Sequence, residues 1–173
     1  QITINPSSDL AEQTEYYVQI AATAFDDSVG NSYAGISDKT SLSFTAADET
    51  PPTIAITSGA SSLKAGETTT VTFTLSEASS NFVEEDISVS GGALSNFASS
   101  SSTVYTATFT PTTDSTTDGV ISVASSKFSD SAGNENADGS ESNNTLTLSV
   151  DTVRPTIAIT SGASSLKAGE TTT

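Results

Sequence analysis

A segment of 19 residues occurs twice in this chain, and this repetition limits the possible folds more than any other feature of the sequence. Residues 52–70 read PTIAITSGASSLKAGETTT, and residues 155–173 read the same, at an offset of 103 positions. Nineteen consecutive identities do not arise by chance, so we predict that the chain is a tandem array of similar units.

The same offset connects other positions and divides the chain into three parts. Phe25 matches Phe128, and Asp48 matches Asp151. We therefore predict that residues 1–50 are the C-terminal half of one repeat, that residues 51–152 are a complete repeat, and that residues 153–173 begin the next. Half of a folded unit would expose apolar faces and strand edges, so we expect the protein to continue at both ends.

Alternation of apolar and polar residues predicts strands rather than helices throughout the complete repeat. Ser-Gly, Gly-Gly and Asp-Gly pairs separate the alternating stretches and act as turn signals. About seven short antiparallel strands in roughly 100 residues are typical of an immunoglobulin-like β-sandwich with a Greek-key arrangement. We therefore predict an all-β chain of tandem sandwiches without helices, with strands near residues 53–57, 71–75, 87–89, 93–95, 104–109, 120–123 and 146–150.

Charge and composition argue against several classes of function. Five basic residues stand against 21 acidic ones, which gives a net charge of −16. Nucleic acids and anionic membrane surfaces bind clustered Lys and Arg, so neither is an expected partner. The chain has no His and no Cys, and therefore lacks the usual catalytic bases, thiols and zinc ligands. We expect no enzyme, and no apolar run is long enough for insertion into a bilayer.

The excess of acids favours a divalent cation, and calcium prefers the carboxylate, amide and backbone oxygens that this sequence offers. We expect that an Asp at a junction and an Asp in a loop can share an ion where two units meet. The alternative is that these residues are solvated acids and turn formers. The candidate ligands form three groups: Asp48, Glu49 and Asp151 near Pro51 and Pro155 at the junctions; Glu77 with Glu84, Glu85 and Asp86; and Asp130, Asn134, Asn136 and Asp138, with Asp27 as a counterpart in the first repeat.

Six segments of the complete repeat form a characteristic string of motifs. They read PTIAIT from Pro52, LKAGE from Leu63, FTLSEA from Phe73, EDISVSGG from Glu85, YTATFTP from Tyr105 and FSDSAGN from Phe128. This string resembles the bacterial Ig-like repeat of giant adhesins of the repeats-in-toxin class and of biofilm-associated surface proteins. Residues 1–50 resemble the end of a related bacterial Ig-like domain.

The resemblance implies a structural spacer in an extracellular protein of the bacterial cell surface. Repeats of this kind hold a terminal binding domain away from the cell, pass through a one-step secretion system and are often stiffened by calcium within or between repeats. The partners of such a repeat are the neighbouring repeats of its own chain. The glycine-rich nonapeptide calcium repeat of the family is absent from this sequence, so that feature is not expected here.

Two other functions remain open. The chain could be a subunit of an extracellular filament or surface layer, in which separate copies contact one another. It could also be a module that itself binds a glycan or a host protein. Tyrosine side chains could stack on a sugar or pack against the sandwich, and the candidates are Tyr16, Tyr17, Tyr33 and Tyr105.

Overall fold

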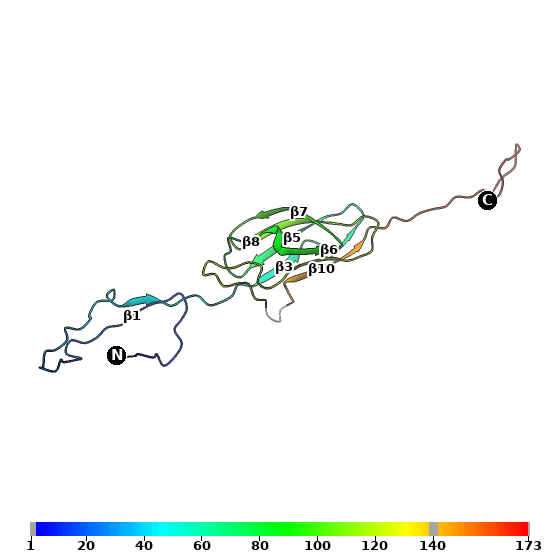
Figure 1. Cartoon of the computed structure of the whole chain (residues 1–173). Helices are drawn as coiled ribbons and strands as arrows, with labels where there is room; N and C mark the ends of the chain where they lie inside the picture. The colour runs from blue at the N-terminus through cyan, green and yellow to red at the C-terminus, as the bar shows by residue number, and fades with distance from the viewer. Residues whose placement is uncertain (1–2, 139–141, 173) are drawn as a thin grey trace.

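A β-sandwich lies between two segments with little regular structure in the computed structural model, which describes residues 3–138 and 142–172. Residues 54–151 form what we call the central sandwich. The N-terminal segment, residues 3–47, reaches it through a linker of residues 48–53, and the C-terminal segment comprises residues 152–172. The two segments leave from opposite ends of the sandwich, so the molecule is elongated (Figure 1).

Two four-stranded sheets make up the central sandwich, which confirms the predicted all-β, Ig-like fold. The strand orders β3-β5-β8-β7 and β4-β10-β9-β6 correspond to the two sheets of the immunoglobulin fold. The pairs are antiparallel except for β4 and β10, which run parallel. The strand bounds are β3 (Ile54–Ser58), β4 (Ser62–Lys64), β5 (Thr69–Leu75), β6 (Ile87–Ser90), β7 (Gly92–Ser99), β8 (Val104–Pro111), β9 (Gly119–Val123) and β10 (Thr145–Asp151).

Alternation along the strands directs one set of side chains into the space between the two sheets. In β5, for example, Val71, Phe73 and Leu75 are buried, while the Thr residues between them face outward. Threonine suits this position because its branched side chain favours extended backbone. The resulting core is narrow and consists mainly of Ile54, Ile56, Leu63, Val71, Phe73, Leu75, Phe109, Ile121, Val123 and Leu148.

Three details differ from the sequence-based prediction. Strand β4 was not predicted, and β7 is longer than predicted because a bulge between Ser95 and Ala98 lets it continue along β8. No α-helix occurs in the described residues, but Glu84–Asp86 form one turn of 3-10 helix, whereas the sequence predicted no helix of any length. Local bonds account for this turn, because the backbone N–H of Asp86 donates to the carbonyl of Val83 and its carboxylate accepts the N–H of Val83.

The N-terminal segment folds as a partial sheet. Strands β1 (Glu15–Tyr17) and β2 (Ser43–Thr45) pair antiparallel, and the rings of Tyr16 and Phe44 stack with their centroids 6.0 Å apart. Large apolar side chains of this segment, including Phe25 and Phe44, are exposed. An open apolar face of this kind is what half of a sandwich would present.

The C-terminal segment contains no strand among its described residues. Ile157 and Ile159 are 85% and 87% exposed. Their counterparts in the identical segment, Ile54 and Ile56, are only 1% and 6% exposed, because β3 pairs with β5 and these side chains belong to the core of the sandwich. Across the part of the chain that is described, we find no helix with the length and apolar character needed to cross a membrane.

Candidate metal centre

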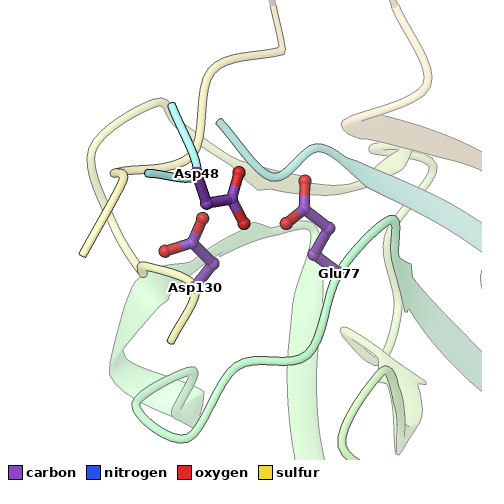
Figure 2. Close-up of side chains that lie close together, drawn as sticks. All are labelled: Asp48, Glu77 and Asp130. Carbon is purple, nitrogen blue, oxygen red and sulfur yellow. The ribbon is translucent and has the colours of Figure 1, made fainter. Parts of the chain in front are cut away.

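Three carboxylates meet where the linker joins the central sandwich. One carboxylate oxygen from each of Asp48, Glu77 and Asp130 lies within 4.8 Å of the other two. Figure 2 shows the three side chains directed toward one another. Asp48 belongs to the linker, Glu77 follows β5, and Asp130 lies in the long connection between β9 and β10. We call these three residues the junction cluster.

Hydrogen bonds within its own loop hold Asp130 in place. Its Oδ1 accepts the backbone N–H groups of Ala132, Gly133 and Asn134 at 2.7–2.9 Å, and its Oδ2 accepts Nδ2 of Asn134 at 2.9 Å. Burial of Asp130, which is 8% exposed, raises the pKa of its carboxyl, but these hydrogen bonds together outweigh burial and lower the pKa below its usual value. Asp130 is therefore an anion with a fixed orientation.

The loop that carries Glu77 is anchored by aromatic packing beneath it. The buried ring of Phe82 contacts the rings of Tyr105 and Phe128, with centroids 5.0 and 5.2 Å apart. The hydroxyl of Tyr105 also donates to the backbone oxygen of Ser79 at 2.9 Å. Because Phe128 precedes Asp130 by two residues, the same aromatic cluster positions both loops of the junction cluster.

Electrostatic repulsion acts on Glu77. Burial raises the pKa of this carboxyl, and the negative charges of Asp48, Asp130 and Glu12 raise it further. Within residues 3–138 and 142–172, the one ion pair joins Lys64 to Glu67, so no Lys or Arg neutralises the junction cluster. The three acids therefore carry a concentration of negative charge that a bound cation would offset.

Asp48 contacts both sides of the junction. Its Oδ2 accepts Nε2 of Gln13 at 2.7 Å, and its backbone oxygen accepts Nδ2 of Asn134 at 3.1 Å. Its Oδ1 accepts the backbone N–H of Thr50 at 3.2 Å, while the hydroxyl of Thr50 donates to Oε2 of Glu12 at 2.7 Å. The linker is thus bonded to the N-terminal segment and to the central sandwich.

The donor set of the junction cluster fits a hard divalent cation. Calcium takes six to eight oxygen ligands and accepts one or both oxygens of each carboxylate, with water and backbone oxygens completing its shell. Three carboxylates on a linker and two anchored loops provide a charged, oxygen-only set of this kind. Zinc and other softer metals prefer Cys and His ligands, which this chain lacks.

The structure brings together residues that the sequence analysis placed in three separate groups. Asp48 and Asp130 meet, as expected for a junction Asp and a loop Asp. Glu77 joins them, whereas we had grouped it with Glu84, Glu85 and Asp86. Those three acids lie in the 3-10 turn, where Glu84 and Glu85 are exposed. The described residues contain no second group of three acids at comparable distances.

Apart from Asp27, the remaining candidates occupy three other places. Glu49 is exposed beside Asp48, and Asp151 is exposed at the opposite end of the sandwich, where its Oδ1 accepts the N–H of Val153 at 3.2 Å. Asn136 and Asp138 are buried and bond to backbone, since Asn136 Oδ1 accepts the N–H of Phe128 and Asp138 Oδ1 accepts that of Ile54.

Asp27 lies in the N-terminal segment and forms the same kind of loop as Asp130. Its Oδ1 accepts the N–H groups of Val29 and Asn31, and its Oδ2 accepts Nδ2 of Asn31 at 2.8 Å. Hydrogen bonds from Asn31, first from its side chain and then from its backbone, lower the pKa of Asp27. The same local bonds between an Asp and the Asn four residues later therefore occur in both loops.

The sequence analysis missed Glu12 and Gln13. They precede β1, and the pairing of β1 with β2 sets them beside the linker, more than 30 positions away along the chain. No motif marks either residue, so only knowledge of this strand pairing could have identified them.

Comparison with known proteins identifies two regions of the chain. A family model described as a bacterial Ig-like domain matches residues 48–147, and a second family model with the same description matches residues 1–46. Comparisons with curated proteins and with solved structures gave no match. The first family match spans more than half of the chain and includes all three residues of the junction cluster.

Proposed function

The chain belongs to the family of bacterial Ig-like domains, and on that premise we propose that it is a spacer region of a long adhesin or other surface protein. Domains of this family are typical of extracellular and surface proteins and are typically non-catalytic structural modules. The elongated arrangement supports a spacer, because segments leave the sandwich at opposite ends and each added unit would add length (Figure 1). The net charge of −16 favours solubility on a crowded cell surface.

The proposal divides the chain into parts of three consecutive Ig-like units. Residues 1–50 would be the second half of one unit, residues 51–152 a whole unit, and residues 153–173 the first strands of the next. The exact repetition of 19 residues and the open apolar face of the N-terminal segment support this division.

The second part of the proposal is that calcium at the junction cluster stiffens the connection between units. The observation that carries it is the meeting of a linker carboxylate, Asp48, with two sandwich carboxylates, Glu77 and Asp130. An ion bound to all three would tie the linker to the sandwich. Because Asp48 is also bonded to Gln13, the ion would restrict the N-terminal segment as well.

Thermal unfolding of the whole chain with calcium and with chelator tests this part. At a calcium concentration one hundredfold above Kd, binding to the folded state adds about 2.7 kcal/mol, which raises Tm by on the order of 10 °C. The variant Asp48→Asn should lose most of this rise. The matched control Asp9→Asn, which removes an exposed carboxylate of the N-terminal segment, should keep it. An equal Tm with calcium and with chelator would remove calcium from the proposal and leave the spacer.

No specific observation favours the two alternative functions. Tyr105 is buried and Tyr16 stacks on Phe44, so the four tyrosines do not form one exposed surface for a glycan. A filament or surface-layer subunit requires contacts between copies of the chain. Sedimentation of the purified chain over a range of concentrations tests for such contacts, and a concentration-dependent increase in mass would favour that alternative.

A further inference from the structure

A hydrogen bond that needs no metal ion joins the linker to the central sandwich. Nδ2 of Asn134 donates to the backbone oxygen of Asp48 at 3.1 Å and to Oδ2 of Asp130 at 2.9 Å. One of these bonds stays inside the loop and the other crosses to the linker. We propose that Asn134 is a latch that fixes the direction in which the N-terminal segment leaves the sandwich, with or without a bound ion.

Bonds within the loop orient the side-chain amide of Asn134 toward the linker before any bond to Asp48 forms. The backbone N–H of Asn134 donates to Oδ1 of Asp130, and the residue before it, Gly133, has a φ of 96°, which glycine adopts without strain. A backbone bridge between Ser129 and Glu135 closes the base of the loop. Because the amide is already oriented by Asp130, forming the bond to Asp48 orders few additional groups.

The other end of the latch is attached to the N-terminal segment. The carboxylate of Asp48 accepts Nε2 of Gln13 at 2.7 Å, and the backbone N–H of Gln13 donates to the carbonyl of Ala46 at 2.9 Å. The side chain of Asp48 therefore bonds to the N-terminal segment, and its backbone oxygen bonds to the central sandwich. Rotation of the N-terminal segment about the linker would break at least one of these bonds.

A second copy of the loop supplies a matched control. Asn31 bonds to Asp27 as Asn134 bonds to Asp130, and Gly30 has a φ of 89°. Among the described residues, Nδ2 of Asn31 has no second acceptor comparable to the Asp48 carbonyl. Replacing either Asn by Ala removes the same side-chain bond inside a loop, from Nδ2 to the Asp carboxylate, but only Asn134→Ala also removes a bond across the junction.

Distance measurements between two spin labels test the latch in the whole chain. The chain has no Cys, so labels can be placed at Ser43→Cys in β2 and at Ser88→Cys in β6, both exposed positions on opposite sides of the linker. In chelator, we expect one narrow distance distribution for the labelled chain and for the same chain with Asn31→Ala. With Asn134→Ala, the narrow distribution should be lost.

The outcomes separate the latch from the proposed calcium site. A narrow distribution that survives Asn134→Ala in chelator would overturn the latch, and so would a broad distribution of the unaltered chain that narrows only with calcium. Tm values of the two Ala variants report whether the sandwich stays folded. If Asn134→Ala unfolds it, Gln13→Ala, which lies outside the sandwich, should broaden the distribution instead. A lack of any calcium effect would contradict the ion site and leave the latch standing.

Discussion

Glu77 is the residue at which charge opposes folding most directly. Its pKa is raised by burial and then by the negative charges of Asp48, Asp130 and Glu12, so its ionised form is less stable in the folded chain than in the unfolded one. This penalty is full above the folded-state pKa and vanishes once the pH falls below the ordinary value of 4.5. If calcium binds at the junction cluster as proposed, the same charge would become favourable, because it would face a cation.

Glu77→Gln should therefore have opposite effects in chelator and in calcium. In chelator at pH 7, removal of the repulsion should raise Tm by about 2–4 °C, which corresponds to about 0.5 kcal/mol. In calcium, the variant should lose most of the rise in Tm that the unaltered chain shows. Calorimetry under both conditions measures the two shifts.

A matched variant and a pH series make this prediction specific. Glu15→Gln removes an exposed carboxylate of β1 and should leave Tm within about 1 °C in both conditions, as is usual for surface substitutions. The difference between Glu77→Gln and the unaltered chain in chelator should shrink as the pH falls toward 4. A lower Tm for Glu77→Gln in chelator at pH 7 would show that repulsion at this position is not what the structure indicates.

The sequence identifies those residues of the junction cluster that a neighbouring motif or a repeat boundary marks. Asp48 was identifiable because it precedes two prolines at a repeat boundary, and Asp130 because a turn motif follows it. Glu77 was placed with Glu84–Asp86, its nearest acids along the chain, but the pairing of β3 with β5 sets the end of β5 beside the linker instead. That proximity depends on the strand register, which no single motif specifies.

Among the secondary-structure elements, the two identical segments separate local from long-range determinants of structure. The turn after Lys64 is present in both copies: Glu67 N–H donates to the Lys64 carbonyl, and Glu170 N–H donates to the Lys167 carbonyl, each at 3.0 Å. The strands β3 and β4 are present only in residues 52–70, where β5 pairs with β3 and β10 pairs with β4. The sequence therefore predicts the turn from local residues, but a strand also requires the strand that pairs with it.

Close packing between β7, β8 and β9 yields a prediction at the level of these strands. The ring of Phe109 in β8 is fully buried and lies against Gly92 and Gly119. A Cβ added at Gly119 would lie 2.5 Å from Cζ of Phe109, so the buried ring would have to shift within a close-packed core. Gly119→Ala should cost about 1–3 kcal/mol of folding free energy, as overpacked core positions do.

Urea unfolding of Gly119→Ala measures this cost, and Gly59→Ala is its control. A Cβ added at Gly59 would meet only Oγ1 of Thr69, at 3.5 Å, which is an ordinary contact. We expect Gly59→Ala to change the free energy of unfolding by less than about 0.5 kcal/mol. Equal stabilities of the two variants would mean that β8 can shift away from β9, contrary to the tight core described above.

Across the whole molecule, a short linker connects the N-terminal segment to the central sandwich, and the stiffness that we propose would depend on it. The linker makes the side-chain bonds of Asp48 and Thr50, and it contains Pro51 and Pro52, of which Pro52 is buried against the sandwich. Proline fixes φ near −65°, so this pair limits the directions in which the N-terminal segment can leave. A spacer needs such a limit, because freely jointed units would coil and shorten the reach of the array.

Pro51→Gly tests the contribution of the linker backbone at this scale. Pro51 is exposed, so its replacement should leave the Tm of the central sandwich within about 1 °C. Glycine removes a constraint that favours the orientation held by the bond between Asn134 and Asp48, so this bond should open more often. Small-angle X-ray scattering should then show a shorter mean maximum dimension and a broader distance distribution. Pro6→Gly, outside the linker, should change neither.

Calcium should restore part of the lost length in Pro51→Gly, because an ion at Asp48, Glu77 and Asp130 would tie down the residues just before position 51. Unchanged scattering for Pro51→Gly would mean that side-chain bonds alone hold the linker straight.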